Sequence, residues 1–167
     1  MSTVVGIVAL LGFVCALAVH LSTFLTAGLQ LDFSSVWPLH VGIFAVFIPM
    51  VFSLRNRFGQ NPDQREIISV LPPWAIKSIA VVFAYVVINF AALFYHIHNG
   101  SPAVRGDTFV IEQRGRVVQE ISESQYLQMR AYVSRGFSGH WLLFYLVPAL
   151  YFLAGRQNDK PRKETGD

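Results

Sequence analysis

Four long stretches of this sequence contain no aspartate, glutamate, lysine or arginine, and they constrain the fold more than any other feature. They cover residues 1–30, 33–54, 78–104 and 136–155. About twenty apolar residues in a helix cross the hydrocarbon core of a bilayer, because each residue adds about 1.5 Å. None of the stretches carries the polar stripe that a helix in a soluble bundle needs. The sequence therefore predicts an all-α integral membrane protein with four transmembrane helices.

Tryptophan and proline residues mark several of the expected helix ends. The predicted transmembrane helices cover residues 4–25, 36–54, 74–96 and 137–154. Trp37 and Trp74 lie near two of the helix starts, where their amphipathic rings suit the membrane interface. Pro49 and Pro148 fall inside helices and are expected to kink them, because proline has no backbone N–H to donate. The first helix is expected to be retained rather than cleaved as a signal peptide, because no basic residue precedes its apolar run.

The distribution of lysine and arginine predicts how the chain is oriented in the membrane. One side of the predicted topology carries basic residues close to helix ends: Arg55, Arg57, Arg65, Lys77, Arg156, Lys160, Arg162 and Lys163. The other side carries its arginines only within the longer segment 97–136. The positive-inside rule makes the first side cytoplasmic. We therefore expect a multi-pass protein of the cell (inner) membrane with both termini in the cytoplasm. Residues 1–156 would form one domain, followed by a disordered tail at 157–167.

The segment 97–136 is the part of the chain expected to fold outside the membrane, on the extracytoplasmic side. Two short apolar runs, 109–111 and 117–118, flank Arg114 and Gly115. This pattern predicts a β-hairpin, although Arg-Gly is a weaker turn signal than Asn-Gly. The predicted insertion between the third and fourth transmembrane helices is therefore a small β-hairpin followed by one helix.

Capping signals place two further helices outside the membrane. Ser122 and Gln125 form the capping-box pattern at the start of an amphipathic helix, and Gly136 is expected to end it. In the cytoplasmic loop, Asn61 is expected to cap a short helix whose first turn holds Pro62.

Five histidines are the strongest candidates for binding chemistry: His20, His40, His96, His98 and His140. Odd helices run outward and even helices return, so all five are expected at or just below the non-cytoplasmic interface. Neutral imidazole is the commonest metal ligand, and helix bundles hold cofactors between facing helices. His20 and His96, on parallel helices at similar depth, would form an axial pair for haem b. His40, His98 and His140 would be ligands of a transition metal.

The alternative interpretation is that the histidines bind no cofactor. His40, His98 and His140 are then interfacial side chains whose polar tips meet water or a lipid headgroup. His20 fits this interpretation least well, because it lies about one turn inside the apolar region. Ser22, Thr23 or a neighbouring helix would then satisfy its ring. Asn89 is the deepest polar residue, and a buried amide at such a position usually holds helices together.

Several classes of function are disfavoured by what the sequence lacks. No acidic or basic residue lies in the middle of a predicted transmembrane helix, which argues against a proton-coupled pump. No nucleophile motif appears, so the sequence favours a non-enzymatic protein without catalytic residues. The lone Cys15 excludes an internal disulfide, and the small net charge of +3 does not predict nucleic-acid binding.

Three functions remain open at this point. The favoured one is a structural or accessory component of the membrane that contacts the lipid bilayer and a membrane protein partner or a second copy of itself. The second is a small haem- or metal-binding membrane protein that uses the histidine cluster. The third is an oligomeric transporter of lipids or small molecules, which is suggested only by the prolines inside two helices.

Overall fold

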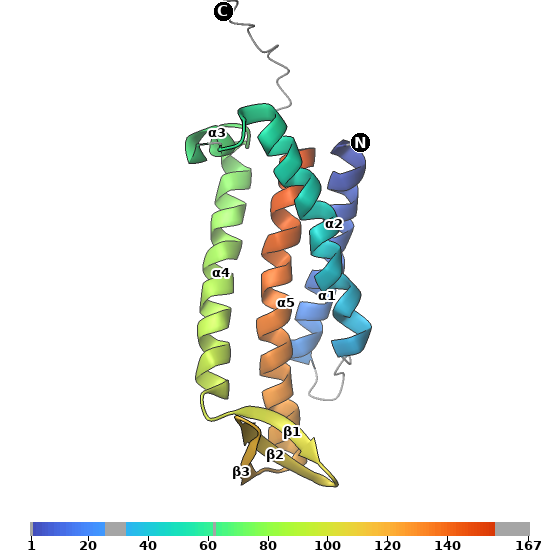
Figure 1. The fold of residues 1–167 in the computed structure, drawn as a ribbon, viewed down its shortest axis with the longest axis vertical. Helices are drawn as coiled ribbons and strands as arrows, with labels where there is room; N and C mark the ends of the chain where they lie inside the picture. Colours follow the sequence, from blue (N-terminus) through green and yellow to red (C-terminus); the bar gives the residue numbers. More distant parts are fainter. Residues whose placement is uncertain (1, 26–32, 62, 156–167) are drawn as a thin grey trace, which may run out of the picture.

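The structure is a computed structural model and describes residues 2–25, 33–61 and 63–155. Four helices in it are long and apolar enough to cross a membrane: α1 (Ser2–Leu25), α2 (Phe33–Phe58), α4 (Pro73–Ile97) and α5 (Glu123–Leu153). They form a bundle with a small sheet at one end and the short helix α3 (Gln64–Ser69) at the other (Figure 1). The predicted set of long apolar helices is thus confirmed. The predicted tail at 157–167 lies outside the described residues.

Helix α5 differs from the sequence prediction because it does not end at Gly136. The amphipathic helix predicted before Gly136 and the transmembrane helix predicted after it form one continuous helix of 31 residues. The capping box at its start, made by Ser122 and Gln125, is confirmed. Gly136 instead provides space, since a Cβ at this position would collide with the Leu93 side chain of α4. Small residues allow such close approach between apolar helices. The glycine at position 136 therefore reflects helix packing, whereas the sequence prediction took it as the end of a helix.

Two other helix starts also differ from their predictions. Helix α3 is capped by Asp63, whose carboxylate accepts a hydrogen bond from the Arg65 amide, and not by Asn61. Glu66 completes the capping box by accepting from the Asp63 amide, so an acid and not an amide begins this helix. Helix α2 begins at Phe33, three residues earlier than predicted.

The sheet has three antiparallel strands, namely β1 (Ser101–Arg105), β2 (Thr108–Gln113) and β3 (Arg116–Glu120), in the order β1-β2-β3. The predicted hairpin is confirmed as β2 and β3. Arg114 and Gly115 connect them with φ values of 52° and 79°, as a two-residue turn of type I′ requires. Strand β1 was not predicted, because its sequence contains a proline and lacks alternating apolar residues. It joins β2 through a turn at Gly106, whose φ is 60°.

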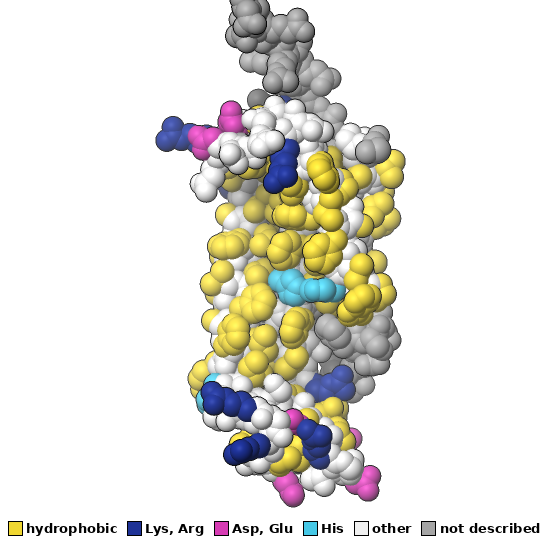
Figure 2. Space-filling view, viewed as in Figure 1, with side chains coloured by type: hydrophobic (Ala, Val, Ile, Leu, Met, Phe, Trp, Pro, Cys, Tyr) yellow, Lys and Arg dark blue, Asp and Glu magenta, His cyan; other side chains and the backbone are white. Residues whose placement is uncertain are grey.

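Helix α5 is the centre of the bundle and packs against each of α1, α2 and α4. Its side chains Trp141 and Tyr145 are almost fully buried in the main core cluster. The Tyr145 ring occupies the space where a Cβ on Gly12 of α1 would lie, so the two helices approach closely. In Figure 2, hydrophobic side chains cover the middle of the bundle, and charged side chains gather at its two ends. We call this exposed hydrophobic zone the apolar belt; Val81, for example, is 69% exposed in it.

Candidate functional site

The first of two polar clusters joins three helices, and we call it the buried network. It consists of His20 of α1, Tyr85 and Asn89 of α4, and Arg135 and Ser138 of α5. His20 Nδ1 lies 2.9 Å from the Ser138 hydroxyl, and His20 Nε2 bonds the Tyr85 hydroxyl. The Arg135 carbonyl accepts from the Ser138 hydroxyl at 3.3 Å and from the Asn89 amide at 2.8 Å.

The contacts of the buried network determine which groups donate hydrogen bonds and which groups accept them. The Ser138 hydroxyl donates to the Arg135 carbonyl, so its oxygen accepts from the Nδ1–H of His20. His20 Nε2 then accepts from the Tyr85 hydroxyl. A neutral His20 thus satisfies both of its ring nitrogens, as a polar group 2% exposed among apolar helices requires. Neighbouring helices supply the partners, whereas the Ser22 hydroxyl bonds a backbone carbonyl.

Arg135 fixes the end of α1 against α5. Its guanidinium donates to the Thr23 carbonyl at 2.9 Å and to the Thr23 hydroxyl at 3.2 Å, in the last turn of α1. It also lies 3.8 Å from the centre of the Phe24 ring, a cation–π contact. A positive charge is favourable at a helix C-terminus, where carbonyls lack partners in the helix. This side chain therefore has a structural explanation, as the rest of the buried network does.

The second polar cluster lies between α2 and α5 and is not fully satisfied. Its rings are those of His40, His140 and Trp141, and the centres of the two imidazoles are 5.6 Å apart. Trp141 Nε1 donates to His40 Nδ1 at 3.1 Å. His140 Nδ1 is buried without a hydrogen bond of good geometry. Phe90 of α4 stacks on the His140 ring, with 5.9 Å between the ring centres.

The contact with Trp141 determines which nitrogen of His40 carries the proton. An indole N–H can only donate, so His40 Nδ1 must accept. The proton of the neutral ring is then on Nε2, which becomes a donor. Within the described part of the chain, no residue accepts a hydrogen bond from this Nε2–H. His40 thus offers a free donor, in contrast to His20.

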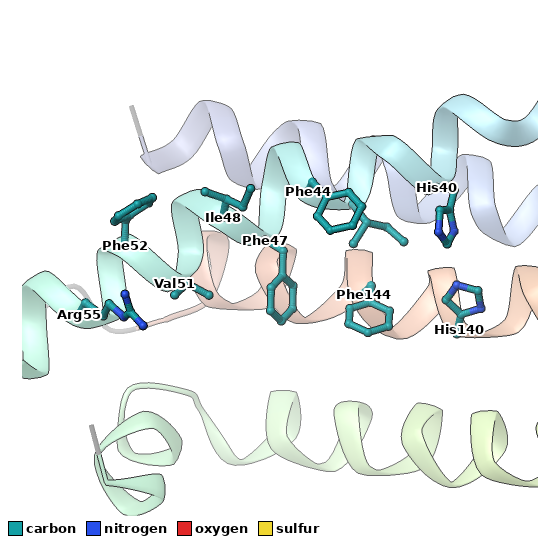
Figure 3. Close-up of a pocket in the computed structure, with 10 residues that line it drawn as sticks. His40, Phe44, Phe47, Ile48, Val51, Phe52, Arg55, His140 and Phe144 are labelled. Carbon is teal, nitrogen blue, oxygen red and sulfur yellow. The ribbon is translucent and has the colours of Figure 1, made fainter. Parts of the chain in front are cut away.

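The free donor of His40 lies at one end of a pocket of about 440 Å³ between α2 and α5 (Figure 3). We call it the α2–α5 groove. His40 and His140 line one end, Arg55 lines the other, and Phe144 of α5 contributes to the floor. The remaining side chains are apolar and come from α2: Ile43, Phe44, Phe47, Ile48, Val51 and Phe52. Of these, Phe44 and Phe52 are 57% and 59% exposed, so the groove opens onto the apolar belt.

Among the described histidines, the structure brings His40 and His140 into ring contact, and it places His20 with Asn89 in the buried network. Histidine side chains lie within the apolar belt on the face shown in Figure 2, and Figure 3 places His40 and His140 in the groove. They were expected at the interface. The reason for the difference is that α2 and α5 begin earlier than predicted, which moves both residues further from the helix ends.

His20 of α1 and His96 of α4, the predicted haem pair, contact α5 at different levels along its axis. His20 bonds Ser138, whereas His96 stacks on Tyr132 at 3.6 Å between ring centres. Six residues separate these two contacts, about 9 Å along the helix axis. His98 lies at the end of α4 and bonds the Tyr95 carbonyl at 2.5 Å.

Among the described residues, no group of three or more histidine, cysteine, aspartate or glutamate side chains is arranged to hold a metal ion. The haem and metal assignments of the histidines stay predictions. Asn89 is 7% exposed, donates to the Arg135 carbonyl of α5 and would collide with a Cβ on Gly139.

Sequence reasoning missed the groove and Trp141. A usable signal was present on α2, where His40, Phe44, Phe47, Val51 and Arg55 recur every three or four residues and therefore share one helix face. The partner face on α5 could not be read in the same way, because every face of that helix segment is apolar.

Comparisons with known proteins identify no relative: no protein-family model, no curated protein and no solved structure matches this chain.

Proposed function

We propose that this chain is a multi-pass membrane protein that acts without catalysis, as an accessory component that holds a lipid-like molecule in the α2–α5 groove. The observation that carries the proposal is the groove itself. Its volume of about 440 Å³ lies in the range of small-molecule sites, and its walls are apolar over most of their length. Because it opens onto the apolar belt, a molecule dissolved in the bilayer would reach it directly.

The membrane location rests on the apolar belt and on the length of the four helices. For orientation, the basic residues near helix ends support a cytoplasmic location of α3 and both termini, and an extracytoplasmic sheet. The cell (inner) membrane is the proposed location.

Binding rather than chemistry is supported by the side chains of the groove. Among the described lining residues the polar groups are two imidazoles and one guanidinium, without a hydroxyl, thiol or carboxylate. This set can donate hydrogen bonds but offers no nucleophile paired with a base.

The test is photolabelling with a long-chain alkyl diazirine in nanodiscs, followed by mapping of the adducts by mass spectrometry. We expect adducts at the groove lining, including Phe47 and Phe144. Val51→Trp, which fills the groove, should remove them. Val81→Trp is the matched control, because Val81 is exposed in the apolar belt on α4. Labelling spread evenly over the belt, or labelling unchanged in Val51→Trp, would contradict the proposal.

A further inference from the structure

The α2–α5 groove has an unpaired hydrogen-bond donor at the end formed by His40. The His40 Nε2–H has no acceptor among the described residues, because Nδ1 is the atom that accepts from Trp141. An amide-like donor left unpaired in apolar surroundings costs the desolvation of that group. A molecule that pairs this N–H group must therefore place an acceptor oxygen at the His40 end of the groove.

The opposite end of the groove, formed by Arg55, does not require an acceptor oxygen on the occupant. Arg55 lies in the last turn of α2, close to the charged end of the bundle, where a long side chain can extend its charge into water. Fifteen residues separate it from His40, which corresponds to about 22 Å along the helix. The walls between the two ends are apolar, with Phe47 and Val51 on α2 and Phe144 on α5. This length suits a hydrocarbon tail that begins at His40 and extends toward Arg55.

The side chains that line the groove favour one kind of head group on a molecule whose tail extends toward Arg55. Its α2 wall is a single helix face, because the lining residues of α2 recur every three or four positions. At the head end the walls are aromatic: His40, His140 and Phe44 line it, and Phe90 stacks behind His140. Flat aromatic walls favour a flat conjugated head, since rings gain from offset or edge contacts with other rings.

Resting on the proposed function, we infer that the α2–α5 groove binds a molecule of the prenyl-quinone class. One quinone carbonyl oxygen accepts the hydrogen bond from His40 Nε2–H, and the single tail follows the apolar wall toward Arg55. A two-chain acylglycerol also carries carbonyl oxygens, but it has no flat conjugated head to pack against the aromatic walls at the His40 end.

The experiment measures competition against the alkyl diazirine label in the same nanodiscs. The competitors are a decyl-substituted benzoquinone, decylbenzene with the same tail and no carbonyl, and dioctanoylglycerol. We expect the quinone to compete about two- to twelvefold more strongly than decylbenzene, because one hydrogen bond contributes about 0.5–1.5 kcal/mol. His40→Phe should abolish this preference while the diazirine still labels the groove. His40→Gln, which keeps a donor and an acceptor, should retain it. Thermal unfolding of each variant establishes that it is folded.

The possible results separate the two proposals. If the groove is labelled but the quinone and decylbenzene compete equally, the quinone assignment is wrong and the lipid-like occupant stands. If dioctanoylglycerol competes best, a two-chain ester replaces the quinone. If the quinone preference persists in His40→Phe, the hydrogen bond is wrong. If the groove is not labelled at all, the proposed function itself fails.

Discussion

At the residue scale, His20 and His40 both lie between apolar helices but differ in how many of their ring nitrogens form hydrogen bonds. His20 uses both ring nitrogens, one toward Ser138 of α5 and the other toward Tyr85 of α4. His40 uses one ring nitrogen toward Trp141 and leaves the other as a donor within the groove. We therefore expect the first residue to contribute to stability, whereas the second is the donor that the proposed binding site uses.

Replacing His20 by phenylalanine should lower the stability of the bundle. The change keeps an aromatic ring but leaves the Tyr85 hydroxyl without its acceptor and Ser138 without its donor. Hydrogen bonds between apolar helices contribute modestly, so we expect a loss of about 1–2 kcal/mol. The measurement is thermal unfolding in mild detergent, followed by size-exclusion chromatography. His98→Phe is the control, because His98 is exposed at the end of α4. Equal losses in the two variants would contradict the structural role of His20.

The sequence alone identified His20 as unusual but could not identify its partners. Its depth followed from its place in an apolar stretch, which is a local property. The identity of Ser138 and Tyr85 as partners depends on which faces of α4 and α5 meet α1. Those faces are apolar nearly all round, so no periodic pattern indicates their orientation. Asn89 was predictable for the opposite reason, since a lone amide in an apolar helix needs a partner wherever it lies.

At the scale of elements, the hairpin of β2 and β3 depends on its two-residue turn. Gly115 has a φ of 79°, a value that a β-branched residue adopts only with strain. Gly115→Val should therefore increase amide hydrogen exchange in both strands about tenfold, because the left-handed conformation costs about 1–2 kcal/mol without glycine. Arg114→Asn should leave exchange unchanged or slow it, since asparagine tolerates the φ of 52° found there. Unchanged exchange in Gly115→Val would show that the strands do not rely on this turn.

The elements also show where sequence signals compete. The helix-start signal at Ser122 was read correctly because a capping box combines two residues at a fixed spacing. The glycine signal at Gly136 was read wrongly because glycine serves equally as a helix end and as a contact point for another helix. A single residue type with two physical uses cannot be assigned without its neighbours in space.

At the scale of the whole molecule, the proposed orientation can be tested by accessibility. In a Cys15→Ser background, Arg114→Cys places a thiol in the turn of the sheet and Gln64→Cys places one at α3. We expect a membrane-impermeant maleimide to label the first variant in intact cells and the second only after permeabilisation. The reverse pattern would invert the proposed topology, and labelling of both variants in intact cells would argue against a single orientation.

Helix α5 has a mechanical consequence for the molecule as a whole. It runs without interruption from Ser122, next to the sheet, through His140 and on to the opposite end of the bundle. An α-helix resists bending and stretching over this length, so it acts as a stiff rod. A displacement of the sheet along the helix axis would therefore also shift the His140 ring, which lies about 25 Å further along the same helix.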